Sequence, residues 1–168
     1  MDFTSKDFEQ TEQVARIVQL CDKTDIEELE RIVDEIYKYQ PFVISIFLGY
    51  KDDMNPYQHD EILRVLIIIW LFFKSNKNVE RRKINVALFE KKQQKNVQFL
   101  QYLSGEPSNE AQLLTTGLNL GQLKSKALFT AVLFKIREGK TLKNLEQRTS
   151  NIILIGMKSL IEAFEHVK

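Results

Sequence analysis

Residues 62–73 of the chain read Ile-Leu-Arg-Val-Leu-Ile-Ile-Ile-Trp-Leu-Phe-Phe, and the part from Val65 to Phe73 is uninterrupted apolar sequence. A helix that is apolar on every side is buried on every side, in lipid or in a protein core. Spanning a bilayer takes about 20 apolar residues, and this run lies between the acidic pair Asp60-Glu61 and Lys74. It therefore predicts the central, fully buried helix of a soluble fold, over residues 62–74.

The composition predicts a single all-α domain over residues 1–168. The chain has 43% hydrophobic and 28% charged residues, with only six glycines and three prolines. Domains commonly contain about 100–150 residues, and scarce Gly and Pro disfavour a loop-rich or all-β chain. Leu, Ile, Lys, Glu and Gln dominate, and most of these favour helices. We therefore expect a bundle of about seven or eight helices around the central one.

Capping residues and breakers set the expected helix boundaries. Thr24 has the spacing of a capping box with Glu27, Pro41 ends the preceding helix, and Gly49 is expected as a left-handed stop. Asn55 and Pro56 read as the N-cap and the first residue of the central helix, and Gly139 as another stop. The expected helices are 6–22 (capped by residue 4 or 5), 24–40, 42–48, 56–75, 78–103, 109–119, 122–138 and 141–167.

Charge is divided unevenly along the chain, although the net charge is only +1. Residues 1–62 contain fifteen acidic and six basic residues, a net charge of −9, whereas residues 63–168 carry +10. Blocks of opposite sign can pair within the fold, pair across a dimer, or leave the basic part free for an acidic partner. Two solvated surfaces that partly neutralise each other are the simplest interpretation.

Cysteine usage and the first residues indicate an intracellular protein. Cys21 is the only cysteine, so no disulfide scaffold is indicated. It falls on the apolar stripe of the first expected helix and is expected to be a small buried hydrophobe. Residues 1–4 are acidic and polar and lack the apolar segment of a signal peptide. We expect a cytoplasmic protein that does not enter membranes and that resembles small helical bacterial proteins in its overall look.

No motif in the chain indicates catalysis, so we expect no catalytic residue, no metal and no cofactor. His59-Asp60 resembles the central pair of HD-type phosphohydrolases, but no histidine precedes it and no aspartate follows it. Gly139-Lys140-Thr141 resembles the end of a phosphate-binding loop, yet Phe134 stands where that loop needs glycine. An enzyme with a dispersed carboxylate and histidine site stays the third hypothesis, because a bundle can assemble such a site without a motif.

An aromatic turn between residues 37 and 59 carries one weak signal of binding. Tyrosines around a turn are common at interfaces, where an apolar ring and a polar hydroxyl both find partners. Core aromatics beside an ordinary capped turn are the simpler interpretation, and metal binding by the acidic and histidine side chains is the least favoured. The candidate interaction surface consists of Tyr37, Tyr39, Tyr50, Asp52, Asp53, Tyr57 and His59.

A basic segment over residues 74–95 carries the second weak signal. It contains eight basic residues and only Glu80 and Glu90 as acids. If the segment is one helix, part of this charge lies on one face and can follow the phosphates of a nucleic acid. A solvated face opposite the acidic N-terminal helices is the simpler interpretation, because no aromatic residues are interleaved for base stacking. The candidate phosphate contacts are Lys77, Arg81, Lys92 and Lys95.

Taken together, these signals favour a non-enzymatic interaction module that docks another protein or itself. Self-association would be as a homodimer in which the basic segment meets the acidic helices of a second copy, with the aromatic turn supplying apolar contact. A nucleic-acid-binding protein that uses residues 74–95 is the alternative, although we consider a nucleic-acid partner less favoured.

The central helix generates the first testable prediction. We expect Ile68 and Trp70 to be buried, and Ile68→Ala to lower the free energy of unfolding by about 2–5 kcal/mol, because a cavity replaces buried methyl groups. Urea denaturation measures this change. A loss below about 1 kcal/mol would mean that the helix is not buried.

Overall fold

The computed structural model describes the backbone of residues 4–105, 120 and 122–167, and the side chains of 4–102, 120 and 122–167. The helix expected at 109–119 lies outside these residues. The described part forms eight α-helices and no strand, which confirms the all-α prediction. They are α1 (Ser5–Lys23), α2 (Ile26–Tyr39), α3 (Pro41–Gly49), α4 (Pro56–Lys74), α5 (Asn78–Arg81), α6 (Val86–Gly105), α8 (Lys126–Glu138) and α9 (Gln147–Phe164), with short 3-10 helices at η1 (Lys51–Asp53) and η2 (Leu142–Asn144).

The central helix α4 begins where its sequence predicts. The Asn55 side chain accepts a hydrogen bond from the Gln58 backbone N–H at 3.0 Å, and the Gln58 side chain accepts one from the Asn55 N–H at 3.1 Å. Pro56 occupies the first helical position, where no N–H is needed. The helix ends at Lys74, directly after the apolar run, and Ser75 is its C-cap.

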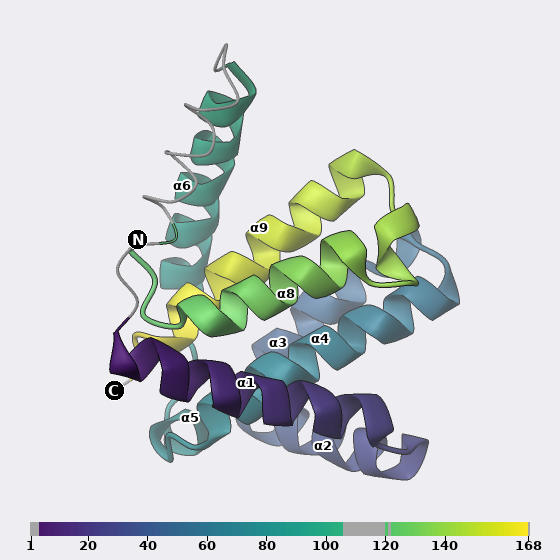
Figure 1. The fold of residues 1–168 in the computed structure, drawn as a ribbon, viewed down its shortest axis with the longest axis vertical. Coiled ribbons are helices and arrows are strands. Elements are labelled where there is room, and N and C mark those ends of the chain that lie inside the picture. The colour runs from purple at the N-terminus through teal and green to yellow at the C-terminus, as the bar shows by residue number, and fades with distance from the viewer. Residues whose placement is uncertain (1–3, 106–119, 121, 168) are drawn as a thin grey trace.

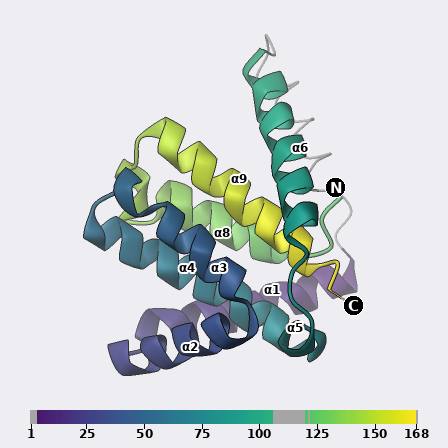
Figure 2. The same ribbon diagram turned by 180° about the vertical axis from the view of Figure 1, so that it is seen from behind.

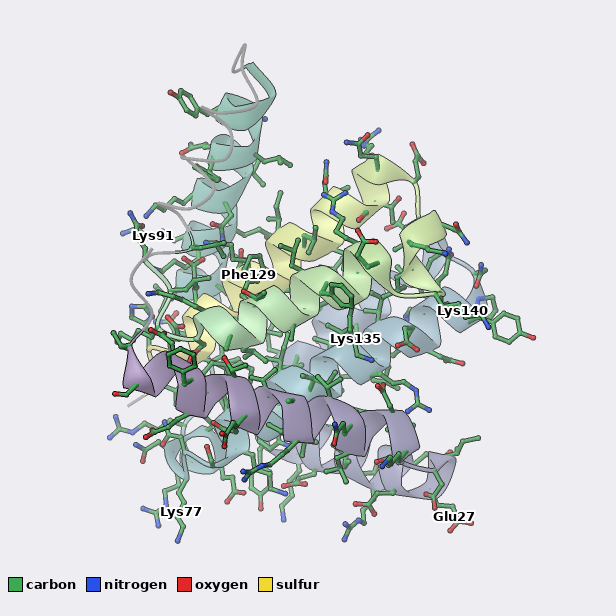
Figure 3. All side chains as sticks on the ribbon, viewed as in Figure 1. Glu27, Lys77, Lys91, Phe129, Lys135 and Lys140 are labelled. Carbon is green, nitrogen blue, oxygen red and sulfur yellow. The ribbon has the colours of Figure 1, made fainter. Side chains whose placement is uncertain are left out.

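The other helices surround α4, which contacts α1, α2, α3, α5, α8 and α9. α1 and α8 lie on the near side in Figure 1, and α3 and α9 come forward when the molecule is turned by 180° (Figure 2). α6 projects away from this group and contacts α9. Charged side chains such as Glu27, Lys77 and Lys91 point outward from the assembly (Figure 3). Within the described residues, no helix has the length and apolar character that a membrane span requires.

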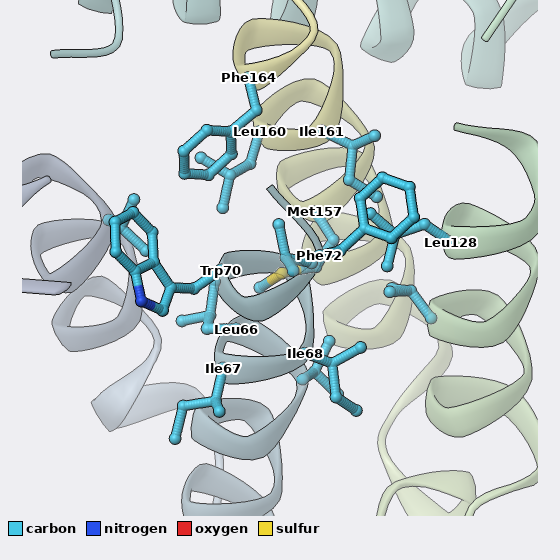
Figure 4. Packing of buried hydrophobic residues seen from close by; sticks show 14 of the residues in the cluster. Leu66, Ile67, Ile68, Trp70, Phe72, Leu128, Met157, Leu160, Ile161 and Phe164 are labelled. Carbon is cyan, nitrogen blue, oxygen red and sulfur yellow. The ribbon is translucent and has the colours of Figure 1, made fainter. Parts of the chain in front are cut away.

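The core confirms the expected burial of the central helix. The exposed fractions of Ile68 and Trp70 are 1% and 0%, and all residues from Val65 to Trp70 are buried. Phe164 of α9 stacks on Phe73 with ring centroids 4.9 Å apart. Figure 4 shows how the side chains of α4 meet those of α8 and α9; the labelled residues are Leu66, Ile67, Ile68, Trp70, Phe72, Leu128, Met157, Leu160, Ile161 and Phe164.

A close approach between α9 and the segment after α3 depends on Gly156. The Tyr50 ring lies directly against this glycine, and a Cβ atom there would overlap the Tyr50 hydroxyl. Tyr50 is consequently buried, and burial raises the pKa of its hydroxyl to about 12. The side chain that follows α3 therefore belongs to the core.

The single helix expected over residues 78–103 is wrong. The chain forms the short helix α5 and the long helix α6, separated at residues 82–85. The buried Gln40 side chain explains the break: its amide nitrogen donates to the carbonyl oxygens of Val79 at 2.5 Å and Arg82 at 2.8 Å, and its amide oxygen accepts from the Ile84 N–H at 2.9 Å. Backbone groups used in this way are not available to a continuous helix.

Two expected helix ends are also corrected. α2 is capped by Asp25, whose carboxylate accepts from the Glu28 N–H at 2.9 Å, whereas the Thr24 hydroxyl donates to the Leu20 carbonyl at the end of α1. Gly49 is the last residue of α3 and does not have a positive φ angle, so it is not a left-handed stop. Of the two expected N-caps of α1, residues 4 and 5, Thr4 is the one observed, and its backbone N–H donates to the Asp7 carboxylate.

The C-terminal helices begin later than expected. α8 starts at Lys126 and not at residue 122, and the expected helix 141–167 consists of η2 followed by α9 from Gln147. Gly139 does end α8, as expected, and a Cβ atom there would overlap the Lys135 carbonyl oxygen. The lack of a side chain therefore allows the chain to turn tightly at this point.

Gln40 generates the second prediction. We expect Gln40→Leu to lower the free energy of unfolding by at least about 2 kcal/mol, because it removes the side-chain partner of two buried backbone groups, those of Val79 and Ile84, at about 1–3 kcal/mol each. The backbone N–H of Ile84 should also exchange faster with deuterium. The control is Gln147→Leu at an exposed position, which should change stability by no more than about 0.5 kcal/mol. Equal effects of the two substitutions would contradict the proposed role of Gln40.

Candidate interaction groove

The aromatic turn does not form one exposed surface. Tyr50 is buried against Gly156, and Tyr39 stacks on Trp70 with centroids 6.3 Å apart. The His59 ring stacks on Phe47 at a centroid distance of 3.9 Å. The exposed members of the expected set are Tyr37, Asp52, Asp53 and Tyr57. Its aromatic rings are therefore divided between the core and the surface.

The histidine in this turn is already engaged by its own surroundings. The Nε2 atom of His59 lies 3.0 Å from the Phe47 carbonyl oxygen. Asp52 and Asp53 lie on the short helix η1 and are exposed. Across the described residues, no three His, Cys, Asp or Glu side chains are grouped closely enough to hold a metal ion. The geometry therefore supplies no reason to place a metal at this turn.

The four expected phosphate contacts do not share one helix. Lys77 precedes α5, Arg81 ends it, and Lys92 and Lys95 belong to α6. Figure 3 shows Lys77 and Lys91 at well separated places on the molecule. One neighbouring feature is a small cleft of about 150 Å³, lined by Arg82, Lys83, Asn85, Leu88, Ala163, His166 and Val167.

Opposite charges pair within the fold at two places between distant segments. Lys74 at the end of α4 lies 2.6 Å from Glu35 of α2. Lys135 of α8 lies 2.7 Å from Asp22 of α1 and 3.6 Å from Glu61 of α4. The acidic N-terminal helices therefore pair with basic side chains from later in the chain. This is the pairing within the fold that the uneven charge division allows.

A buried polar network joins α6 to α9. The amide nitrogen of Asn96 donates to the Ser159 hydroxyl at 3.0 Å and to the Glu162 carboxylate at 2.8 Å. The ammonium group of Lys158 donates to the Asn96 amide oxygen at 2.7 Å and lies 3.1 Å from Glu162. These four residues are all buried. The network supplies the polar link between α9 and the helix that projects from the bundle.

The Lys158 ammonium in this network and the Cys21 thiol are buried groups that could react, but their surroundings hold both in an unreactive state. Burial lowers the pKa of Lys158, while the Glu162 carboxylate opposes that shift. Burial raises the pKa of the Cys21 thiol to about 11, so the thiol stays protonated at neutral pH. A protonated buried thiol is a poor nucleophile, and the lysine is held by an ion pair. Both arrangements match a structural role better than a catalytic one.

A groove of about 720 Å³ lies between α1 and α8, and we call it the α1–α8 groove. The two helices run in the same direction, because Gln10 bonds to the Lys124 carbonyl near their starts and Asp22 pairs with Lys135 near their ends. The groove is lined by Asp7, Thr11, Val14, Ala15, Val18, Gln19, Asp22, Leu120, Lys126, Ala127, Thr130, Ala131, Phe134, Lys135 and Gly139.

Small and apolar side chains form the body of this groove. Ala15 of α1 and Ala127 and Ala131 of α8 leave room between the two helices. Phe134 lines the groove while 65% of its surface is exposed. Phe8 is also 65% exposed and lies one and two helical turns before Thr11 and Ala15 on α1. Large exposed aromatic rings beside an apolar hollow are typical of a surface that binds something.

Charged residues lie at the two ends of the groove. At the start of both helices, Lys126 is near Asp7, whose carboxylate is bonded to the N-cap Thr4. At the other end, Lys135 faces the two carboxylates of Asp22 and Glu61. Ligand sites commonly have this composition, an apolar body with a few polar groups.

Sequence reasoning missed the groove, although a signal for it was present. On α8, Ala127, Ala131 and Phe134 are spaced i, i+4 and i+7, which is one face of a helix. This face differs from the one that carries the buried Leu128, Val132 and Ile136. A second apolar face on one helix indicates a surface with a partner, but only the fold shows that α1 lies beside it.

No protein family model, no curated protein and no solved structure matches this chain in the comparisons.

The contrast between the buried network and the exposed ion pair generates the third prediction. We expect Glu162→Ala to lower the free energy of unfolding by about 3–5 kcal/mol, because it leaves the buried Lys158 ammonium without its counter-charge. The matched control is Asp22→Ala, which removes a carboxylate from a half-exposed pair and should cost no more than about 1 kcal/mol.

Chemical denaturation of both variants measures the difference. Replacing the pair together, with Lys158→Met and Glu162→Leu, should restore part of the stability, since an apolar pair of similar size is often neutral. If the double variant is as unstable as Glu162→Ala, the loss does not come from an unpaired charge.

Proposed function

We propose that this chain is a non-enzymatic interaction module that docks a helix of a protein partner in the α1–α8 groove. The observation that carries the proposal is the apolar groove itself, with Phe134 on its wall and a volume of about 720 Å³. Docking an amphipathic helix into an apolar groove is a recurrent mode of protein recognition.

The dimensions of the groove suit a helix. Its lining on α1 extends from Asp7 to Asp22, which corresponds to about 20 Å at a rise of 1.5 Å per residue. About four turns of a partner helix fit along that length. The groove is lined by small side chains, those of Ala15, Ala127 and Ala131. Apolar side chains of the partner at i, i+3 or i+4 and i+7 therefore have space to enter it.

The competing functions have less support from side-chain geometry. The buried lysine, glutamate and cysteine are engaged or protonated, and the described residues offer no group of three metal-binding side chains. Nucleic-acid binding has the small cleft beside Arg82 and Lys83 in its favour. The four lysine and arginine residues expected to follow phosphates lie on separate segments, which weakens that alternative.

The fourth prediction tests docking in the groove. The probe is a fluorescein-labelled amphipathic peptide with Glu in its first turn, Leu at i, i+3, i+4 and i+7 spacing, and Lys in its last turn. We expect saturable binding by fluorescence anisotropy, weakened at least about tenfold by Ala131→Trp, because the indole fills the groove. Phe134→Ala should weaken binding as well, since it removes an aromatic contact from the wall.

A matched control separates the groove from other surfaces. Tyr57 is 80% exposed and lies outside the groove lining, so Tyr57→Ala should bind the peptide like the original chain. Thermal unfolding of each variant confirms that it is folded. Equal binding by the original chain and by folded Ala131→Trp would show that the groove is not the docking site.

A further inference from the structure

We propose that the partner helices that occupy the α1–α8 groove belong to a second copy of this chain, in a two-fold dimer that sets the two grooves face to face and antiparallel. This inference rests on the docking function proposed above and names its partner. It replaces the dimer contacts expected from sequence, which used the aromatic turn and the basic segment.

The face that carries the groove is complementary to itself. A two-fold interface uses the same patch on both subunits, so that patch has to present both the hollow and the projection that fills it. The α1–α8 face does so, because Phe134 lines the groove and still has 65% of its surface exposed. Phe8 on α1 adds a second exposed ring of equal exposure. Two copies can therefore each place aromatic rings against the alanine floor of the other.

The parallel course of α1 and α8 gives the groove an electrical direction. Both helix N-termini lie at the Lys126 end and both C-termini at the Asp22 end. Each helix carries the equivalent of about half a positive charge at its N-terminus and half a negative charge at its C-terminus. The two macrodipoles therefore add, which makes the Lys126 end positive and the Asp22 end negative.

Side-chain charges reinforce this direction at the negative end. At the positive end, the Asp7 carboxylate accepts hydrogen bonds from Thr4, and its charge is balanced by the nearby Lys126. At the negative end, two carboxylates, Asp22 and Glu61, share the single ammonium of Lys135. The side chains thus leave the Lys126 end neutral and give the Asp22 end a surplus negative charge, and the helix N-termini make the Lys126 end the more positive of the two.

These charges select the antiparallel arrangement. With the two-fold axis perpendicular to the helices, Lys126 of each copy faces the Asp22 and Glu61 end of the other, and the opposed macrodipoles attract. With the axis along the helices, like ends meet and repel. Complementary potentials of this kind set orientation and suppress wrong arrangements. The apolar floor supplies the remaining contact, since exposed ion pairs alone contribute little.

The test uses two charge reversals and their mixture. Lys126→Glu makes both ends of the groove acidic, and Asp22→Lys makes the Asp22 end basic. We expect each variant to dimerise at least about tenfold more weakly than the original chain in sedimentation equilibrium, since Lys126→Glu sets acidic ends against each other and Asp22→Lys sets a basic end against the helix N-termini. An equimolar mixture should recover dimers, because the acidic end made by Lys126→Glu then faces the basic end made by Asp22→Lys.

Recovery in the mixture is the decisive readout. If a substitution weakens dimerisation by destabilising the fold of its own chain, adding the other variant does not restore dimers. Tyr57→Ala, outside the groove, is the control and should dimerise normally, whereas Ala131→Trp should dimerise poorly. Raising the salt concentration should weaken the original dimer, because about 10 Å is the screening length at 0.1 M salt.

The outcomes separate this inference from the proposed function. If the original chain sediments as a monomer at about 100 μM and low salt, or if the mixture does not recover dimers, the second copy is not the occupant. The docking function then still stands if the amphipathic peptide binds and Ala131→Trp abolishes that binding. If the chain neither dimerises nor binds the peptide, both proposals are wrong.

Discussion

The rest of the structure depends on the need to bury α4 on all of its sides. Six consecutive residues, from Val65 to Trp70, are buried, so no face of this helix can be left to solvent. Six other helices contact it, and large buried side chains of α8 and α9 point towards it. The burial is complete enough that the exposed fraction of the Trp70 side chain at the end of this run is 0%.

The chain has to change direction often to cover one helix completely. Polar side chains then join the segments that are brought together. Gln40 does this at the α2–α3 junction, where one amide group binds the backbone of α5 and of the break that follows it. Arg64 bonds to the Cys21 carbonyl at 2.6 Å and fastens the end of α1 to α4. The network around Asn96 and Lys158 does the same for α6 and α9. Each of these groups joins segments that are far apart in the chain.

The groove follows from the same constraint. α1 and α8 both turn one face towards α4, and they lie side by side with small residues between them. Because they run in the same direction, their dipoles add instead of cancelling. A hollow with opposite electrical ends therefore arises from the way the helices cover the core, and the exposed Phe8 and Phe134 make it an apolar surface that water solvates poorly.

The sequence by itself determined the all-α class, the central helix from Pro56 to Lys74 and the burial of Ile68 and Trp70. Those features depend on local periodicity, caps and a long apolar run, which are all visible within a short window. Only the tertiary structure decided the break at residues 82–85, the burial of Tyr50 and the position of the groove. The break depends on Gln40, about forty residues earlier, and Tyr50 depends on the missing side chain of Gly156. The groove forms because α1 lies beside α8, and the two helices are more than a hundred residues apart in the chain. A local sequence pattern cannot predict a contact over that separation.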